Sequence, residues 1–179
     1  MTEIPGSGVG TAADTGVDAR ALAVRLIDEL TRRGLTIAVA ESLTGGLVVA
    51  ELIAVPGASA VVRGGVVAYA TELKASLLGV DAALLAEKGP IDAEVARQMA
   101  EGVRWRLGHD GAPADVGLAT TGVAGPDSQD GHPVGEVWIG VAIGEVVTAH
   151  GLTLTGDRAS IRSAVVSESL ARVLGRLPE

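Results

Sequence analysis

The sequence contains no cysteine and no phenylalanine, and aromatic residues make up only 2% of its 179 residues. Without cysteine the chain can form no disulfide, no thiolate nucleophile and no cysteine-ligated metal site. With so few aromatic residues, its core must be built from Val, Leu, Ile and Ala. Hydrophobic residues nevertheless account for 47% of the chain, so we predict one folded domain rather than a disordered segment.

Paired histidines, basic patches and long apolar runs are also missing. His109, His132 and His150 are scattered, and none pairs with another at helical ligand spacing, so we predict no metal site. The net charge of −8, without a dense Lys/Arg patch, argues against nucleic-acid binding. No apolar run approaches the roughly 20 residues of a membrane span, and the N-terminus lacks a signal-peptide pattern. We expect a cytoplasmic protein with neither nucleic-acid nor membrane partners.

The chain divides into a polar start and an α/β domain. Residues 1–17, rich in Gly, Thr and Ala, are expected to form a flexible tail, and residues 18–179 one domain. Apolar periodicity and β-branched runs predict helices over 18–33, 47–53, 71–78 and 92–107, a last helix opening at 156–158, and strands over 36–40, 61–69, 116–120, 134–143 and 146–154. The two-residue turn at 144–145 predicts an antiparallel hairpin. We therefore predict a three-layer α/β domain whose mixed, mostly parallel sheet carries helices on both faces.

Three polar, glycine-bearing turns stand at the ends of predicted elements, over residues 41–46, 121–126 and 156–158. In open α/β sheets, ligands bind in crevices at the carboxyl ends of strands. Polar side chains gathered there usually serve a site, so these turns indicate where the chemistry lies.

The first of these turns is the most informative. Ser42 and Thr44 supply hydroxyl groups, and Gly45 and Gly46 let the backbone approach a ligand closely. If a helix begins there, its free N–H groups favour an anion or a developing oxyanion. The same residues would equally suit a helix cap that has no function. The turn alone leaves both interpretations open.

A serine nucleophile needs a base, and no histidine lies near a comparable turn. Lys74 is the best remaining candidate, because a lysine acts as a base when burial or a neighbouring charge lowers its pKa. It follows the only tyrosine, Tyr69, by five residues, and Lys88 is the only other lysine. Judged alone, Lys74 is more typical of a solvated helix position, and Tyr69 of a strand end.

A series of short motifs resembles the CinA C-terminal domain family in both order and spacing. They are residues 40–46 (AESLTGG), 55–59 (VPGAS), 65–69 (GVVAY), 72–74 (ELK), 78–80 (LGV), 121–127 (TGVAGPD), 133–138 (PVGEVW) and 156–158 (GDR). The resemblance covers roughly residues 20–175. Each motif is weak alone, but together they are highly specific.

The resemblance implies an amidohydrolase that converts nicotinamide mononucleotide to nicotinate mononucleotide and ammonia, without metal or cofactor. The family's catalytic serine falls on Ser42, its tyrosine on Tyr69 and its lysine on Lys74. Ser42 would attack the carboxamide carbon, and Lys74, assisted by Tyr69, would take up and return the proton. The backbone N–H groups of residues 44–46 would hold the oxyanion.

The substrate would be bound at its phosphate and sugar end by residues of the second and third turns, chiefly Thr121 and Arg158. The full set of expected substrate-binding residues is Thr44, Gly45, Gly46, Thr121, Gly122 and Arg158. The sequence departs from the family pattern at Leu43, where the family usually has Cys, and over residues 89–92 and 127–132.

Two alternatives remain beside the deamidase. One is a CinA-like binding module, linked to competence or DNA damage, that keeps the fold without turnover. The other is an amidase for a different small amide. Retention of Ser42, Tyr69 and Lys74 together favours an enzyme with a small nucleotide substrate. Whether the chain forms a homo-oligomer stays open.

Overall fold

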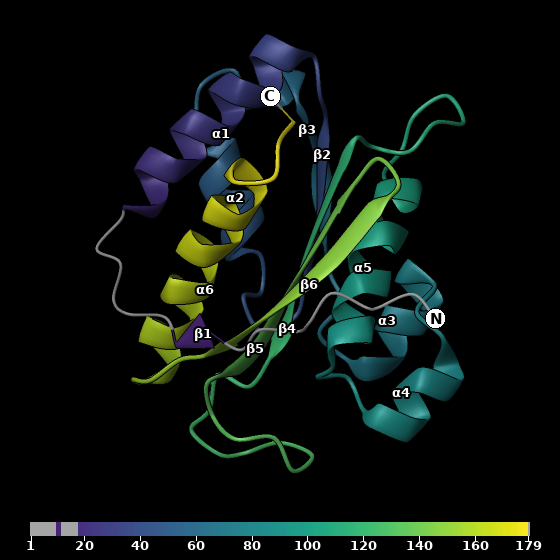
Figure 1. The fold of residues 1–179 in the computed structure, drawn as a ribbon, viewed down its shortest axis with the longest axis vertical. Coiled ribbons are helices and arrows are strands. Elements are labelled where there is room, and N and C mark those ends of the chain that lie inside the picture. Colours follow the sequence, from purple (N-terminus) through teal and green to yellow (C-terminus); the bar gives the residue numbers. More distant parts are fainter. Residues whose placement is uncertain (1–9, 12–17, 179) are drawn as a thin grey trace, which may run out of the picture.

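A six-stranded sheet forms the middle layer of the molecule, and helices cover both of its faces (Figure 1). The computed structural model describes residues 10–11 and 18–178, to which the structural statements below refer. The prediction of a three-layer α/β domain with a mixed sheet is confirmed. The flexible tail expected over residues 1–17 lies outside the described residues, except for residues 10 and 11.

Apart from three short elements that were not predicted, the elements follow the predicted order. The strands are β1 (Gly10–Thr11), β2 (Ile37–Glu41), β3 (Val62–Val67), β4 (Val116–Gly122), β5 (Glu136–Ile143) and β6 (Val146–Thr153). The helices are α1 (Ala19–Arg33), α2 (Leu47–Ile53), α3 (Thr71–Leu78), α4 (Ala82–Lys88), α5 (Ala93–Arg106) and α6 (Arg158–Leu174), with a 3-10 turn, η1 (Ala58–Ala60). The elements that were not predicted from the sequence are β1, η1 and the helix α4. Asp81 caps that helix by accepting a hydrogen bond from the N–H of Ala83.

The sheet has the strand order β1-β6-β5-β4-β2-β3. β2 pairs in parallel with β3 and with β4, whereas β5 runs antiparallel to both of its neighbours, β4 and β6. The turn at residues 144–145 joins β5 to β6, so the predicted hairpin is confirmed. The carboxyl ends of β2, β3 and β4 therefore meet at one end of the sheet, which is the lower end in Figure 1. The turns predicted to carry the chemistry gather at that end.

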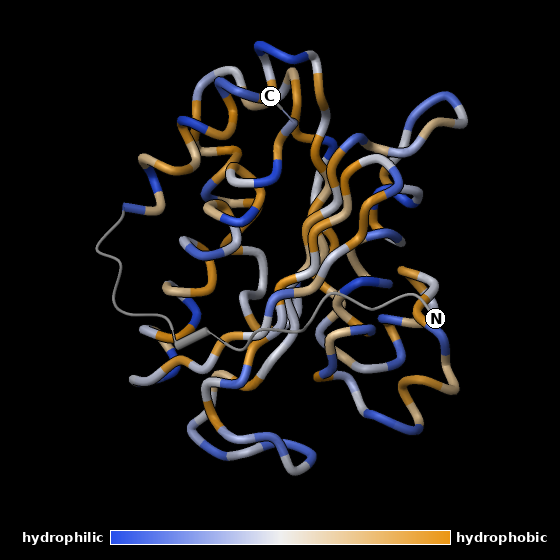
Figure 2. The backbone as a smooth tube through the Cα atoms, viewed as in Figure 1, coloured by the Kyte–Doolittle hydropathy of each residue, from blue (hydrophilic) through white to orange (hydrophobic). Residues whose placement is uncertain are grey.

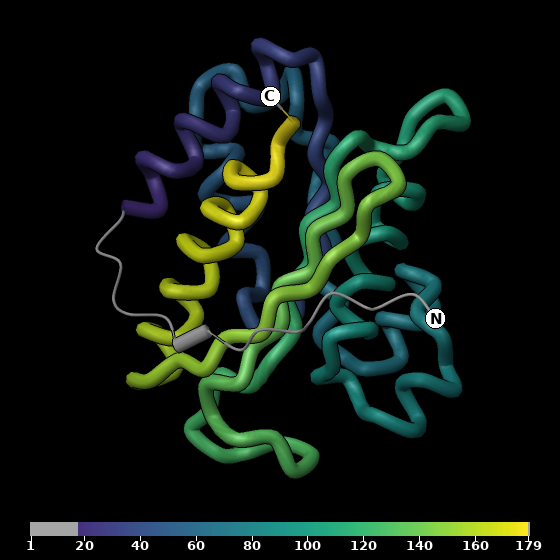
Figure 3. The backbone as a smooth tube through the Cα atoms, in the orientation of Figure 1, coloured from purple at the N-terminus to yellow at the C-terminus, as the bar shows by residue number. Residues whose placement is uncertain are grey.

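Two apolar cores hold the layers together, one on each face of the sheet (Figure 2). The first packs α1, α2 and α6 against β2, β4 and β5, and α6 lies beside α1 although they are the last and first helices (Figure 3). The second packs α3, α4 and α5 against the opposite face. The apolar residues that recur at helical spacing in α1, α5 and α6 are all buried, namely Leu22, Leu26, Leu30, Val95, Met99, Val103, Ile161, Val165, Val166, Leu170 and Val173.

Small residues bring α5 unusually close to the sheet. A Cβ atom on Gly117 would lie 2.0 Å from the carbonyl oxygen of Ala100, and one on Gly140 would lie 2.0 Å from that of Ala96. No side chain fits at either glycine. This close packing brings the segment just before α5, including Pro90 and Ile91, to the end of the sheet where the turns gather.

Within the part of the chain that the structure describes, no helix combines the length and the apolar character needed to cross a bilayer.

Candidate active site

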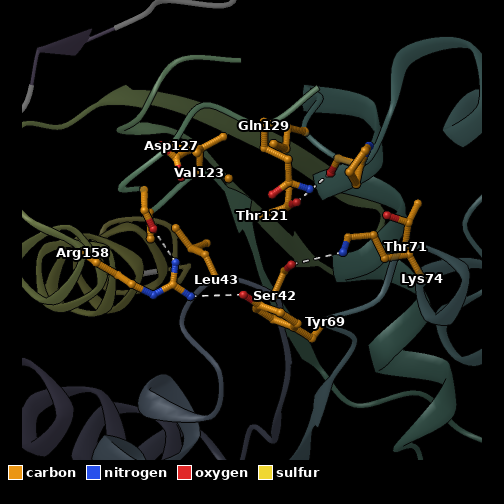
Figure 4. Close-up of a pocket in the computed structure, with 15 residues that line it drawn as sticks. Ser42, Leu43, Tyr69, Thr71, Lys74, Thr121, Val123, Asp127, Gln129 and Arg158 are labelled. Atoms are coloured by element: carbon orange, nitrogen blue, oxygen red, sulfur yellow. Dashed lines mark hydrogen bonds between the residues drawn. The ribbon is translucent and has the colours of Figure 1, made fainter. Parts of the chain in front are cut away.

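The turns after β2, β3 and β4 and the start of α6 enclose one pocket (Figure 4). Its lining residues are Ser42, Leu43, Tyr69, Thr71, Lys74, Pro90, Ile91, Thr121, Gly122, Val123, Ala124, Gly125, Asp127, Gln129 and Arg158. The structure thus brings six of the expected site residues together: Ser42, Tyr69, Lys74, Thr121, Gly122 and Arg158. It does not bring Thr44, Gly45 and Gly46 into the lining.

Ser42 and Lys74 are in direct contact in this pocket. The Nζ of Lys74 donates hydrogen bonds to the Oγ of Ser42 at 3.1 Å and to the carbonyl oxygen of Ala68 at 2.9 Å. Lys74 is only 1% exposed and Ser42 8% exposed. Burial lowers the pKa of Lys74 from 10.5 to about 8, although the charge of Glu72 acts in the opposite direction. An amine with such a pKa can accept a proton near neutral pH.

The backbone fixes both members of this pair. Ser42 directly follows β2, and its N–H donates to the carbonyl oxygen of Thr120 at 3.0 Å, which extends the pairing of β2 with β4. Ala68 follows β3, and its N–H donates to the carbonyl oxygen of Glu41 at 2.8 Å. Because Lys74 is in turn bonded to Ala68, its amine is held against the strand end that carries Ser42.

The N-terminus of α2 is occupied by a side chain of the protein itself. The buried carboxylate of Glu41, 1% exposed, accepts hydrogen bonds from the N–H groups of Gly46, Val48 and Val49 at 2.9, 3.1 and 2.9 Å. These donors are therefore not available to a substrate anion. The expectation that this helix end would bind an anion is wrong, because the buried carboxylate needs those hydrogen bonds itself.

The remaining expected contacts of this turn are also made within the protein. The N–H of Gly45 donates to the carbonyl oxygen of Ser42 at 3.1 Å. The hydroxyl of Thr44 is buried and lies 2.8 Å from the hydroxyl of Thr120. In the described structure, the N–H groups of Leu43 and Thr44 have no protein acceptor. Of the expected donors at residues 44–46, only the N–H of Thr44 is thus available, and the N–H of Leu43 joins it.

Arg162 in α6 holds this turn, and the sequence analysis missed it. Its Nε and Nη2 donate to the carbonyl oxygens of Leu43 and Thr44, both at 2.9 Å. It lies four residues after Arg158 and hence on the same side of α6. That spacing was the available signal, because one helix face carrying two arginines beside a polar turn indicates two contacts rather than one.

Arg158 lies at the mouth of the pocket and contacts Tyr69. Its guanidinium donates to the carbonyl oxygen of Gly125 at 2.7 Å and to the hydroxyl of Tyr69 at 3.1 Å (Figure 4). Tyr69 is 61% exposed, and its hydroxyl is bonded to Arg158 rather than to Lys74. Arg158 takes part in none of the ion pairs among residues 18–178. Its charge therefore faces the pocket without a paired carboxylate.

Thr121 and Gly122 shape the floor of the pocket at the end of β4. The buried hydroxyl of Thr121 donates to the carbonyl oxygen of Pro90 at 2.6 Å, so its proton is already used. A Cβ atom on Gly122 would lie 2.5 Å from the carbonyl oxygen of Glu136. Thr121 thus joins β4 to the segment before α5, and Gly122 allows the backbone of β5 to pack closely against the end of β4.

Asp127 and Gln129 also line the pocket, and the sequence analysis assigned them no role. They belong to the loop over residues 127–132, where this sequence departs from the family pattern. The backbones of Gln129 and His132 pair with each other, and the Nδ1 of His132 lies 3.0 Å from a carboxylate oxygen of Glu136. Among the residues that the structure describes, no three His, Asp or Glu side chains are grouped to hold a metal ion.

Comparison with known proteins identifies relatives along nearly the whole chain. Residues 19–177 match the profile of the CinA C-terminal domain. A CinA-like protein of Frankia casuarinae is 48% identical over 176 residues, which is 97% of this chain and 38% of that protein. A putative competence-damage inducible protein of Geobacillus kaustophilus is 46% identical over 82% of this chain and 34% of its own length. The chain thus spans less than two fifths of either relative.

Solved structures share the fold over their whole length. A CinA superfamily protein of Escherichia coli superposes with a TM-score of 0.85 at 29% identity, over 99% of this chain and 100% of that one. The competence/damage inducible protein CihA of Agrobacterium tumefaciens superposes with a TM-score of 0.81 at 32% identity, over 98% of both chains.

Proposed function

This chain belongs to the CinA C-terminal domain family, and on that premise we propose that it hydrolyses the carboxamide of nicotinamide mononucleotide. The products are nicotinate mononucleotide and ammonia. The observation that carries the proposal is the contact between the Nζ of Lys74 and the Oγ of Ser42, with a lysine pKa of about 8. A nucleophile paired with a base of lowered pKa suits acyl transfer.

In the first half of the reaction, Ser42 becomes acylated. Neutral Lys74 takes the hydroxyl proton of Ser42 while the Oγ attacks the carboxamide carbon and forms a tetrahedral intermediate. The protonated lysine then gives its proton to the nitrogen of the leaving group. The C–N bond breaks, ammonia departs, and the nicotinoyl group remains on Ser42 as an ester.

In the second half, water regenerates the enzyme. Lys74, neutral again, takes a proton from a water molecule that attacks the ester carbon. The bond to the Oγ of Ser42 breaks, and the lysine returns the proton to that oxygen. The product acid loses its remaining proton to solvent, and nicotinate mononucleotide leaves as the carboxylate. In both halves the N–H groups of Leu43 and Thr44, next to the nucleophile and without protein acceptors, are the donors suited to the oxyanion.

The pocket also offers contacts for the rest of the nucleotide. Leu43, Pro90 and Ile91 provide apolar surface for the pyridine ring. The guanidinium of Arg158, oriented by Gly125 and Tyr69, suits the phosphate, because Arg matches phosphate oxygens with parallel N–H donors. With a net charge of −8 the protein repels anions overall, so a phosphorylated substrate needs such a local cation.

The test is ammonia release by the purified protein with nicotinamide mononucleotide, with the pyridine product identified by chromatography. Ser42→Ala should remain folded by circular dichroism and release no ammonia, because a methyl group cannot form the ester. Turnover in a folded Ser42→Ala protein would remove Ser42 from the nucleophile role. Ammonia released only from a different amide would change the substrate, and none from any amide would favour the binding module.

A further inference from the structure

The loop that carries the nucleophile is held by a guanidinium that does not line the pocket. We infer that Arg162 is a positioning residue that keeps the N–H groups of Leu43 and Thr44 aimed at the oxyanion. The inference rests on the proposed acyl transfer at Ser42 and names the residue that supports its transition state.

The contacts of Arg162 are specific for this turn. Its Nε and Nη2 reach two consecutive carbonyl oxygens, those of Leu43 and Thr44, both at 2.9 Å. Gly45 leaves room for the guanidinium, since a Cβ atom there would lie 3.3 Å from the Nη2 of Arg162. Gly45 also has a φ of +60, in the left-handed region, which disfavours any residue with a side chain. The guanidinium and the turn thus fit one another closely.

Peptide geometry carries the effect of Arg162 to the first donor. In a trans peptide the C=O and the next N–H lie in one plane and point in opposite directions. The carbonyl of Leu43 and the N–H of Thr44 belong to the same peptide. When Arg162 binds that carbonyl, it therefore also fixes the direction of the Thr44 N–H.

The second donor is fixed through one further hydrogen bond. Arg162 also binds the carbonyl of Thr44, and this orients the N–H of Gly45 in the same peptide. That N–H donates to the carbonyl of Ser42 at 3.1 Å. The carbonyl of Ser42 shares its peptide with the N–H of Leu43. One guanidinium therefore fixes both free donors that follow the nucleophile.

This role differs from a simple tie between α6 and the turn. A structural tie would contribute to stability alone. Misaligned oxyanion donors, in contrast, reduce the stabilisation of the transition state more than the binding of the substrate. Loss of one oxyanion donor lowers kcat by about a hundredfold to a thousandfold. Loss of the support for two donors should therefore reduce kcat while KM stays nearly constant.

The experiment compares Arg162→Ala and Arg162→Lys with the wild type and with Arg172→Ala. Arg172 is a matched control, because it lies on the same helix and pairs with Glu168 away from the pocket. Two readouts are used: kcat and KM for ammonia release, and the rate at which a fluorophosphonate probe labels Ser42, followed by mass spectrometry. Labelling also develops negative charge on an oxygen beside Ser42, and it needs no nicotinamide substrate.

In Arg162→Ala we expect the probe to label Ser42, and the protein to release ammonia, at least about tenfold more slowly than in the wild type. A tenfold decrease corresponds roughly to a partial loss of one oxyanion donor, and KM should stay within about twofold. Arg162→Lys should recover part of the rate, because lysine can bind only as a point charge. The midpoint of the pH profile of kcat/KM should be the same as in the wild type, because the pKa of Lys74 determines it. Arg172→Ala should match the wild type in kcat, KM and labelling rate. This pattern would support positioning of the oxyanion donors.

Other patterns overturn the inference. A folded Arg162→Ala protein that labels as fast as the wild type contradicts it, and so does a rise in KM with kcat unchanged. An equal loss in Arg172→Ala contradicts it as well. If Arg162→Ala does not fold, the same criteria apply to Arg162→Lys. If the wild type labels at Ser42 but releases no ammonia from nicotinamide mononucleotide, the proposed function fails while the labelling rates still decide the role of Arg162.

Discussion

The Nζ of Lys74 lies 3.1 Å from the Oγ of Ser42, although one residue belongs to α3 and the other follows β2. With the amine protonated, Lys74 donates this hydrogen bond. With the amine neutral, the same contact can reverse, so that the hydroxyl of Ser42 donates to the lone pair of Nζ. The pair thus needs no rearrangement to pass from its resting form to its reactive form. The proton on Lys74 alone decides which form is present.

The rate should therefore follow the titration of Lys74. We expect kcat/KM to rise with pH and to level off above a midpoint near 8, because the reactive amine is the neutral one. Lys74→Met keeps a similar unbranched stem and removes the base. It should lower kcat/KM by about a hundredfold or more and abolish that midpoint. The measurement is the pH profile of both proteins, and an unchanged profile in the variant would place the base elsewhere.

The same lysine should reduce the stability of the folded state. Its folded pKa of about 8 lies below the ordinary 10.5, so between these values the unfolded chain binds more protons and the free energy of unfolding rises with pH. Below pH 8 the full cost, roughly 3 kcal/mol, is present. Lys74→Met removes it, at the loss of two hydrogen bonds. We expect the variant to be more stable than the wild type at pH 7.

Urea unfolding of both proteins at pH 7 and near pH 10 tests this expectation. The advantage of Lys74→Met should shrink as pH rises, because the wild-type lysine is then neutral in both states. A difference in stability that does not vary with pH would show that burial of the charge is not its cause.

Arg158 and Tyr69 should act on substrate preference as one unit. Arg158→Ala should lower kcat/KM for nicotinamide mononucleotide by about tenfold to a hundredfold, the scale of a charge-assisted hydrogen bond, and leave the unphosphorylated riboside nearly unaffected. Tyr69→Phe removes the acceptor of one guanidinium hydrogen bond and should have a smaller effect in the same direction. The double variant should be no worse than Arg158→Ala. Additive losses would instead indicate that the two side chains act separately.

Glu41 should be important for stability although it does not line the pocket. Glu41→Gln replaces one carboxylate oxygen by an NH2 group, which cannot accept from the N–H groups at the start of α2. A buried donor left without an acceptor costs about 1–3 kcal/mol. Denaturant unfolding should show this decrease in the free energy of unfolding. Glu145→Gln is the control, because it makes the same substitution in the exposed β5–β6 turn. Equal stability of the two variants would contradict the assignment.

Chelators should leave the activity unchanged. In the proposed reaction Ser42 supplies the nucleophile and Lys74 the base, so no step requires a metal ion. Ammonia release measured with and without EDTA should agree. Loss of activity that a single divalent metal restores would contradict this mechanism.

Much of the fold follows from local patterns. Leu22, Leu26 and Leu30 recur every fourth residue and are all buried, and residues 144–145 form the expected hairpin turn. The turns that carry Ser42, Thr121 and Arg158 meet because parallel strands end at the same side of a sheet. These features depend on residues close together in the sequence or on general rules of sheet topology, so they can be predicted from the sequence.

The finer contacts of the site depend on partners distant in sequence. Arg162 binds the carbonyl of Thr44 from 118 residues away, and no periodicity marks that pairing. Glu41 takes the N–H groups that the helix end was expected to offer to a ligand. The hydroxyl of Tyr69 has Arg158 as its partner rather than Lys74. Motifs identify such residues as polar and close together, but only the packed structure shows which donor meets which acceptor.

The division of the site between two cores has a consequence for how the molecule assembles. Lys74 comes from α3, which packs on one face of the sheet, and Arg162 from α6, which packs on the other. Reactivity at Ser42 then requires both halves to be in place, whereas circular dichroism records each helix as it forms. In refolding, recovery of Ser42 labelling should therefore follow recovery of the helical signal. During synthesis, the nucleophile would gain its full support only once α6, the last helix, has docked.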